Sequence, residues 1–197
     1  MSVGVRWGGF AEKMQKIELR FFEEKMKNAS VFLVVSVLTL SVLQNAYGFS
    51  GQGSGTEQDP YIITDVFQLQ EMNNDLDAWY ELGNDIDASD TKNWNDGAGF
   101  IPVGNAENSF TGTFDGNNFS ITDLYINRNQ DYVGLFGKAG GIIQDVRITN
   151  LTILSGGSSC IGGLVGRHVG RDISNVHITG HIEGYDFVGG RIVSIFS

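Results

Sequence analysis

Residues 132–137 read YVGLFG, and residues 160–166 read CIGGLVG, a near copy of the same short phrase. The phrase begins a third time as FVGG at residues 187–190. The copies start 28 and then 27 residues apart. Self-similarity at a period between about 20 and 50 residues is the sequence pattern of solenoids and other repeat arrays. The chain is therefore predicted to be a repeat protein.

A second phrase recurs between the glycine phrases. Residues 143–149 read IQDVRIT, residues 173–179 read ISNVHIT, and residues 121–127 read ITDLYIN. Apolar and polar side chains alternate in each copy, which predicts short strands with one inward face. This alignment predicts two stacked rows of inward side chains: Leu124, Val146 and Val176 in one row, and Ile126, Ile148 and Ile178 in the other.

Short strands, glycine turns and this repeat length predict an all-β chain folded as a parallel β-helix, a β-solenoid in which strands stack on equivalent strands. The glycine phrase would form a corner where backbone segments approach closely. Residues 49–127 are expected to hold the N-terminal cap and the first coils. Residues 128–197 are expected to hold the glycine-phrase repeats, incomplete at the C-terminal end.

A short helix is expected before the first coil. Thr64 or Asp65 can cap a helix that runs to about Asn74, and this helix would cover the open end of the apolar interior. Aromatic side chains lie nearby in the sequence, and they are expected to pack in the cap or core, with sugar binding as the alternative. The helix is expected to turn Val66, Leu69 and Met72 to one side, and the aromatic residues are Trp79, Tyr80, Trp94 and Phe100.

The N-terminal segment is read as an export signal. Residues 26–48 combine a short basic start, an apolar run at 31–43 and small residues up to Gly48, which predicts a signal peptide cleaved after that glycine. A membrane anchor is the alternative, but the run is shorter than the roughly 20 apolar residues of a membrane span. Residues 1–25 precede a complete signal, so translation is expected to start at Met26. The sequence predicts a secreted or cell-surface protein whose mature chain has no transmembrane span.

The exported part is acidic. Without residues 1–48 the chain retains 7 basic and 19 acidic side chains. An acidic surface repels phosphate backbones, so no nucleic-acid partner is expected. Cys160 is the single cysteine of the chain, which excludes an internal disulfide framework. Stability is therefore expected to come from packing and backbone hydrogen bonds.

Several of these phrases resemble a known family. YVGLFG, CIGGLVG and ISNVHITGHIEG resemble the GLUG motif of large bacterial secreted and cell-surface proteins. The upstream phrases GSGTEQDPYIITDVFQLQEM, YELGNDIDAS, FIPVGN and FTGTFDGNNFSITDLYI resemble the segment that commonly precedes such repeats. The resemblance covers most of residues 53–190. It implies a right-handed parallel β-helix in an exported, adhesin-like protein, sometimes joined to a protease or carbohydrate-active module, and it supplies no catalytic residues.

The resemblance ends inside the third glycine phrase. The pattern requires a leucine, a small apolar residue and a glycine, as at residues 164–166, but residues 191–197 read RIVSIFS. A solenoid needs a polar cap over its last coil. The break therefore predicts a truncated or frame-shifted product, or a fragment of a longer protein. An alternative is that the uncapped apolar end pairs with a partner chain, including a second copy.

Two sets of side chains are candidate metal ligands. Asp85, Asp87 and Asp90 offer oxygen ligands for calcium, although the stretch lacks the glycine and distal glutamate of an EF-hand loop. If this stretch is a strand, the first two carboxylates point to water, so solvated acids are the alternative. The spacing of His177 and His181 occurs in zinc sites, but together with the upstream Cys160 and His168 the intervals match no established cluster, and a structural role is preferred.

An enzymatic role is the alternative to a binding role. No H-E-x-x-H, G-x-S-x-G or P-loop motif occurs. The remaining hypothesis is a calcium-assisted polysaccharide lyase or hydrolase fragment, which requires paired carboxylates, or a calcium cluster with an Arg or Lys base, on adjacent coils. Asp115, Asp123 and Asp145 are the available acids. Asp123 and Asp145 are expected at equivalent positions, which Asn175 takes one repeat later.

The sequence favours a non-catalytic structural or adhesive module. It is expected to present an acidic face to a protein or glycan partner, with no cofactor unless calcium binds. Asn118 and Asn150 lie in N-x-[ST] sequons, the acceptor pattern for N-glycosylation. Their modification depends on the host.

Overall fold

The computed structural model describes residues 48–156 and 160–184. Three of the expectations above therefore fall outside the described residues. These are the leader at residues 1–25, the signal peptide up to Tyr47, and the broken repeat after residue 184.

The described chain is an all-β protein with a few short helices, as predicted. The helices are α2 (Val66–Glu71) and three 3₁₀ turns, η1 (Met72–Asn74), η2 (Ser89–Asn93) and η3 (Asn95–Gly97). The strands are β1 (Tyr61–Ile63), β2 (Trp79–Leu82), β3 (Ile86–Asp87), β4 (Thr113–Asp115), β5 (Ser120–Thr122), β6 (Tyr125–Asn127), β7 (Phe136–Ala139), β8 (Ile142–Ser155), β9 (Val165–His168) and β10 (Ile173–Gly184).

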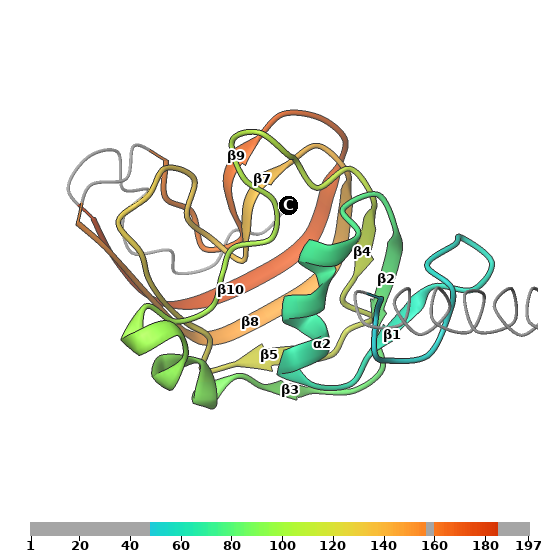
Figure 1. Ribbon diagram of the computed structural model, residues 1–197, viewed down its shortest axis with the longest axis horizontal. Helices are drawn as coiled ribbons and strands as arrows, with labels where there is room; N and C mark the ends of the chain where they lie inside the picture. Colours follow the sequence, from blue (N-terminus) through green and yellow to red (C-terminus); the bar gives the residue numbers. More distant parts are fainter. Residues whose placement is uncertain (1–47, 157–159, 185–197) are drawn as a thin grey trace, which may run out of the picture. The chain divides into compact units, whose positions relative to one another are not determined.

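The named strands that pair with one another do so in parallel, and β8 is at the centre of the larger sheet (Figure 1). Three short strands, β4, β5 and β6, pair in turn along one edge of β8, and β10 follows its other edge. β2 and β1 continue outward from β4, and β3 continues outward from β5. β7 and β9 form a separate two-stranded parallel sheet. Parallel pairing needs long connections, which the stretches between equivalent strands provide.

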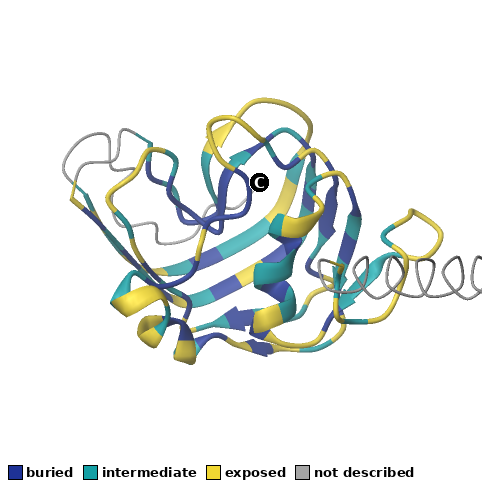
Figure 2. Ribbon diagram, in the orientation of Figure 1, coloured by how far each residue is buried: buried dark blue, intermediate teal, exposed yellow. Residues whose placement is uncertain are grey.

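Equivalent positions of the strands form rows of inward apolar side chains. The alternation of buried and exposed positions follows from the pleat, which turns successive side chains to opposite faces (Figure 2). Two rows are isoleucines, and a third is aromatic at one end and aliphatic at the other. The pairings give the rows Ile86, Ile121, Ile148 and Ile178; Ile126, Ile153 and Ile182; and Tyr61, Tyr80, Phe114, Ile143 and Ile173.

One predicted register is wrong. The pairing of residues 143–148 with 173–178 is confirmed, including Val146 opposite Val176. However, residues 121–127 lie beside residues 148–154, with Ile121 opposite Ile148 and Ile126 opposite Ile153. The offset is therefore 27 residues rather than 22. Alternating apolar residues run through the whole of β8, so the alternation alone fits both registers.

The glycine phrases form a corner in which two backbone segments run unusually close together. Val133 pairs with Ile161, and Phe136 of β7 lies opposite Val165 of β9. A Cβ atom on Gly134 would lie 2.5 Å from the carbonyl oxygen of Gly162. Real Cβ atoms essentially never approach a neighbour so closely. Glycine recurs in the phrase because any side chain would separate the stacked copies.

An earlier copy of this corner lies in the stretch FIPVGN. Val103 forms a parallel bridge with Phe136, and the amide of Gly137 donates to the carbonyl of Val103 at 2.9 Å. Gly104 has a φ of 73°, a left-handed conformation that favours glycine. Although FIPVGN shares only a valine–glycine pair with the later phrases, it occupies the same place in the stack.

The predicted helix is present and its N-cap is Asp65. The Oδ1 atom of Asp65 accepts a hydrogen bond from the amide of Gln68 at 2.8 Å, which satisfies one of the unpaired amides of the first turn. Val66, Leu69 and Met72 are buried, as expected, and belong to the same apolar cluster as the strand interiors. Figure 1 shows α2 crossing the middle of the view in front of the strands.

Asp and Asn residues occupy the bends of the sheet. Asp123 and Asn150 have φ values of 59° and 55°, and Asp145 and Asn175 have values of 54° and 50°. The amide group of Asn150 donates to the carboxylate of Asp123, and that of Asn175 donates to Asp145. Asp and Asn tolerate the left-handed conformation better than other side chains with a Cβ atom. Each bend is therefore fixed by residue type and by a bond to the next copy.

Candidate interaction surfaces

The predicted calcium ligands lie on the outer surface but are not gathered. Ile86 is buried while Asp85 and Asp87 are exposed, as expected for this strand. Asp85 Oδ1 accepts from the amide of Ser120 at 2.8 Å, and Asp87 Oδ1 accepts from the amide of Ser89 at 2.9 Å. The latter bond lowers the pKa of Asp87. In the described part of the chain, no three His, Cys, Asp or Glu residues are placed to share a metal ion. Calcium binding by Asp85, Asp87 and Asp90 stays a prediction.

The histidines and the cysteine occupy separate places. His168 lies opposite Ala139 in the β7–β9 sheet, and His177 lies opposite Arg147, as the repeat predicts. His181 Nε2 lies 3.7 Å from a carboxylate oxygen of Glu183, and both side chains are mostly exposed. Cys160 is half-buried, and its carbonyl accepts the amide of Val133 at 2.9 Å.

The carboxylates considered for catalysis serve the backbone and the sheet. Asp115 accepts from the amide of Asn117 at 2.7 Å and from the side chain of Gln144 at 2.7 Å. Asp123 and Asp145 are not at equivalent positions, because the corrected register places Asp123 beside Asn150. The two acids therefore belong to different bends and do not form a pair across neighbouring strands.

The two sequons have different surroundings. Asn118 is exposed, with a φ of 60°, in the turn between β4 and β5. Asn150 lies within β8, and its side-chain amide is engaged by Asp123. Both asparagines are exposed, and they differ in that the side-chain amide of Asn150 donates to Asp123.

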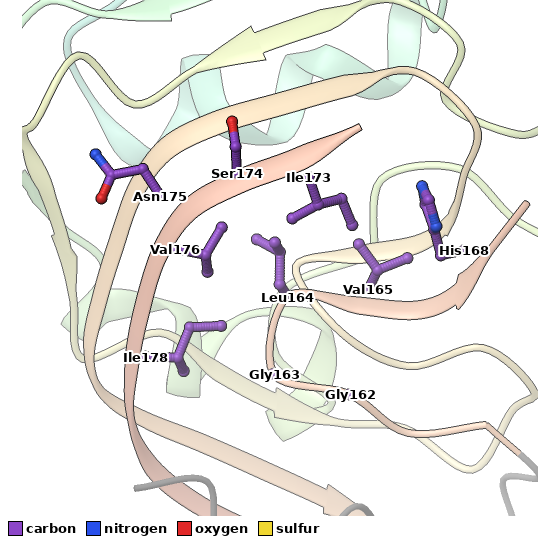
Figure 3. Close-up of a pocket in the computed structure, with 10 residues that line it drawn as sticks. All are labelled: Gly162, Gly163, Leu164, Val165, His168, Ile173, Ser174, Asn175, Val176 and Ile178. Carbon is purple, nitrogen blue, oxygen red and sulfur yellow. The ribbon is translucent and has the colours of Figure 1, made fainter. Parts of the chain in front are cut away.

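An apolar pocket, here called the end pocket, lies beside the last described strands. It has a volume of about 360 Å³ and is lined by side chains of β9, β10 and the glycine phrase before β9. Figure 3 shows Leu164, Val165, Ile173, Val176 and Ile178 around the same space, with His168 at one side and Asn175 directed away from it. These side chains occupy inward positions of the repeat. No described strand lies on the far side of β10 to cover them.

A second apolar feature, here called the cap patch, is formed by Phe67, Trp94 and Ile101. The side chain of Phe67 is 61% exposed, and its ring stacks on Trp94 with a centroid distance of 5.0 Å. Ile101 is 42% exposed, and both its amide and its carbonyl are bonded to the side chain of Gln70. Tyr80 and Phe100 are buried, which confirms the core role expected for these two aromatic residues.

A polar hollow lies between η1 and the loop at residues 105–111. Its volume is about 630 Å³, and its lining includes Asp75, Asp77, Glu107 and Asn108. Local hydrogen bonds shape the loop, since Asn105 Oδ1 accepts from the amides of Glu107 and Asn108 at 3.0 and 2.9 Å. The hollow offers carboxylate and amide side chains.

Charge is divided unevenly along the chain. Residues 48–127 carry 14 Asp and Glu side chains and a single basic one, Lys92. Residues 128–184 carry four acidic side chains, five Lys and Arg side chains and all three histidines. The first half of the described unit is strongly negative, and the second half is close to neutral.

Burial shifts the pKa of two further groups. Tyr80 is buried and donates its hydroxyl to the carbonyl of Asp75 at 2.8 Å, and its pKa is raised, mainly by burial and next by the charge of Asp75. Arg128 donates to the carbonyls of Phe100 and Gly99 at 2.8 and 3.0 Å, and partial burial lowers its pKa. Both side chains tie loops to the sheet.

These observations define an all-β protein with parallel strands, an apolar interior and an acidic outer surface at one end. None of the described helices is long and apolar enough to cross a membrane. No family model matches the chain, and no solved structure matches it.

Two curated proteins are similar in sequence. The chain is 34% identical over 156 residues to halomucin of Haloquadratum walsbyi, an alignment that covers 74% of this chain and 2% of that protein. It is 32% identical over 161 residues to a protein of Evansella cellulosilytica described as a Gly-rich membrane protein, with 75% of this chain and 18% of the relative covered. The chain thus matches a small part of each relative.

Proposed function

We propose that this chain is a non-catalytic module of a secreted or cell-surface protein, and that it presents its acidic face to a protein or glycan partner. In this proposal the strands wind as a right-handed parallel β-helix of the GLUG type, with α2 as the cap of the first coil. The module is structural or adhesive. Its role is to hold a rigid binding surface rather than to carry out a reaction.

The observation that carries the proposal is the stacking of equivalent residues over successive copies. The row Ile86, Ile121, Ile148 and Ile178 recurs every 27 to 35 residues in parallel register. Such stacking supports a solenoid, because each copy then contacts only its neighbours and buries a continuous core. A solenoid offers long, flat outer faces, which suit binding.

The acidic half supplies the binding surface in this proposal. Hydroxyl-rich glycans are held by carboxylate and amide groups, and the hollow beside Asp75 and Glu107 has such groups. An acidic surface also disfavours acidic glycans, since like charges repel. Neutral or amino sugars are therefore the expected glycan class.

The names of the relatives agree with a surface location. One relative is named halomucin and the other is described as a Gly-rich membrane protein. The chain spans only 2% and 18% of their lengths, so its role within any larger protein is part of the proposal.

A glycan array with neutral, amino and acidic sugars tests the proposal. We expect binding to neutral or amino sugars, and we expect the double variant Asp75→Asn, Glu107→Gln to lose it. The matched control is Glu57→Gln, Asp96→Asn, which removes the same charge from exposed positions outside the hollow. Equal loss in both variants would contradict a site in the hollow. Binding to proteins alone would make the partner a protein, and turnover of a bound glycan would overturn the non-catalytic role.

Calcium is tested in the same preparation. If Asp85, Asp87 and Asp90 bind calcium, the thermal midpoint should rise with calcium concentration, because a ligand that binds only the folded state stabilises it. The variant Asp87→Asn, Asp90→Asn should lose that rise. An unchanged midpoint in the unmodified chain would retire the calcium prediction and the calcium-assisted enzyme with it.

A further inference from the structure

Exposed apolar side chains lie near the two opposite ends of the strand order. Among the described residues, the large apolar side chains that are exposed are Phe67, Ile101 and Val169. The first two belong to the cap patch, beside the first strands, and Val169 follows His168, the last residue of β9, which lines the end pocket. β1 and β10 stand at opposite ends of the order in which strands pair through β2, β4 and β8. Exposed apolar groups of this kind mark interaction surfaces.

Two sets of contacts hold parts of the cap patch in place. The rings of Phe67 and Trp94 are stacked at an interplanar angle of 27°. The amide of Ile101 donates to Gln70 Oε1 at 2.8 Å, and Gln70 Nε2 donates to the carbonyl of Ile101 at 2.9 Å, which holds the backbone of Ile101. Because the aromatic pair is already stacked, it loses less side-chain entropy when a partner covers it.

The end pocket is the complementary surface. It is apolar, and its lining residues Leu164, Val165 and Val176 come from inward positions that other copies of the repeat keep covered. Inward side chains of a strand are normally covered by the next strand of the sheet. In the end pocket, another apolar surface, such as the cap patch, can cover them instead.

The charges around the two surfaces favour their association. The residues of the cap patch have acidic neighbours in the sequence, namely Asp65, Glu71 and Asp90. They belong to residues 48–127, which carry 14 acidic side chains and one basic one. The strand and loop beside the end pocket carry Arg167, Arg171 and Asp172, which leaves one positive charge, in the half that has five Lys and Arg side chains against four acidic ones. Opposite charge brings such surfaces together and orients them. Two cap ends, by contrast, repel each other.

We propose that copies of this chain associate head to tail, with the cap patch of one copy placed against the end pocket of the next. The contact is heterologous, because the two surfaces differ, and a heterologous contact that does not close a ring produces an open array. The inference goes beyond the glycan or protein partner proposed above. It depends on the strand order and on the two surfaces, and it holds whether or not the acidic hollow binds a sugar.

Sedimentation velocity of the whole chain over a dilution series tests the association. We expect species that grow with concentration in the unmodified chain. Phe67→Asp removes the cap surface, and Val176→Asp places a charge among the side chains that line the pocket. Each should weaken self-association about tenfold or more. Phe67 is exposed, and Val176 is half-buried on a strand that pairs with β8 alone among the described strands, so the fold should be kept. Asn118→Asp, an exposed position in the turn between β4 and β5, adds the same charge at neither surface and should leave association unchanged.

Mixing the two variants gives the sharpest result. Phe67→Asp retains a working pocket and Val176→Asp retains a working cap patch, so an equimolar mixture should form dimers that do not grow further. A mixture that stays monomeric while the unmodified chain associates would overturn the head-to-tail arrangement. A monomeric unmodified chain at every concentration would overturn self-association itself.

The other possible occupant of the end pocket is the chain's own C-terminal segment. Phe187→Asp distinguishes the two, because it alters the third glycine phrase and leaves both proposed surfaces intact. Unchanged self-association is the result expected. Stronger self-association that Val176→Asp abolishes would support docking at the pocket, with the segment as a competitor. A change in self-association that Val176→Asp leaves in place would overturn the proposal. Glycan binding measured on the same variants separates this inference from the proposed function.

Discussion

The glycines of the recurring phrase have a steric role that a single substitution can test. Gly134→Ala should destabilise the fold by about 1 to 3 kcal/mol, the usual cost of overpacking, because its Cβ would lie 2.5 Å from the carbonyl oxygen of Gly162 and 3.0 Å from that of Phe136. Urea unfolding followed by circular dichroism measures the change. Gly156→Ala is the matched control, since nothing lies within 4 Å of its Cβ position. Equal destabilisation by both would contradict the close-approach argument.

Tyr80 predicts how stability changes in alkaline solution. Its ordinary pKa is 10.0, and burial raises the pKa in the folded state. As the pH rises, the Tyr80 hydroxyl therefore loses its proton in the unfolded chain before it does so in the folded chain. The contribution of Tyr80 to stability is complete below about pH 10, and it is lost as the pH rises from there toward the folded-state pKa. We expect the free energy of unfolding to fall above pH 10. The decline should be shallower in Tyr80→Phe, and identical slopes in the two proteins would contradict the assignment.

At the scale of single residues, sequence reasoning was most successful where residue type and conformation are linked. The glycine phrase was recognised as a recurring corner, and Asp145 and Asn175 were placed at the same position. The match between Asp123 and Asn150 was missed, although both can adopt the left-handed conformation that the bend requires. That shared preference of Asp and Asn is the signal that could have chosen the correct register.

The cap helix is the element whose formation depends most on one side chain. Asp65→Ala removes the bond from the amide of Gln68, which should cost about 0.5 to 2 kcal/mol. Asp65→Ser keeps an acceptor at the N-cap and should remain close to the unmodified protein. Thermal unfolding monitored by circular dichroism compares the three chains. A loss of stability in the serine variant equal to that of the alanine variant would show that the cap bond is not the cause.

At the scale of elements, the short helix and the strands were predictable but some partners were not. The N-cap at Asp65 and the inward side chains of α2 follow from local sequence pattern. The copy of the corner at Val103 and Gly104 was missed, because only the valine–glycine pair is shared with the later phrases. The lining of the end pocket also could not be predicted, since it combines residues of β9, β10 and the glycine phrase that only the fold brings together.

The charge distribution predicts how the whole molecule responds to salt. With 14 acidic side chains and one basic side chain in residues 48–127, self-repulsion destabilises the folded state at low ionic strength. Salt screens this repulsion, since the Debye length falls to about 10 Å at 0.1 M. We expect the thermal midpoint to rise with sodium chloride. Neutralising the exposed side chains Glu57, Asp90, Asp96 and Glu107 should flatten that rise, and an unchanged salt response would contradict it.

The position of β8 between its neighbours also has a consequence for how the molecule folds. Its partners on both edges lie 27 to 30 residues away in the chain, and no tight hairpin joins any of them to it. Every rung of the sheet therefore closes a long loop before it gains a hydrogen bond, which slows folding relative to chains rich in local contacts. Once formed, β8 is protected on both sides by paired strands. In a hydrogen-exchange experiment its central amides should be the last to exchange, and the amides of β1 should exchange early.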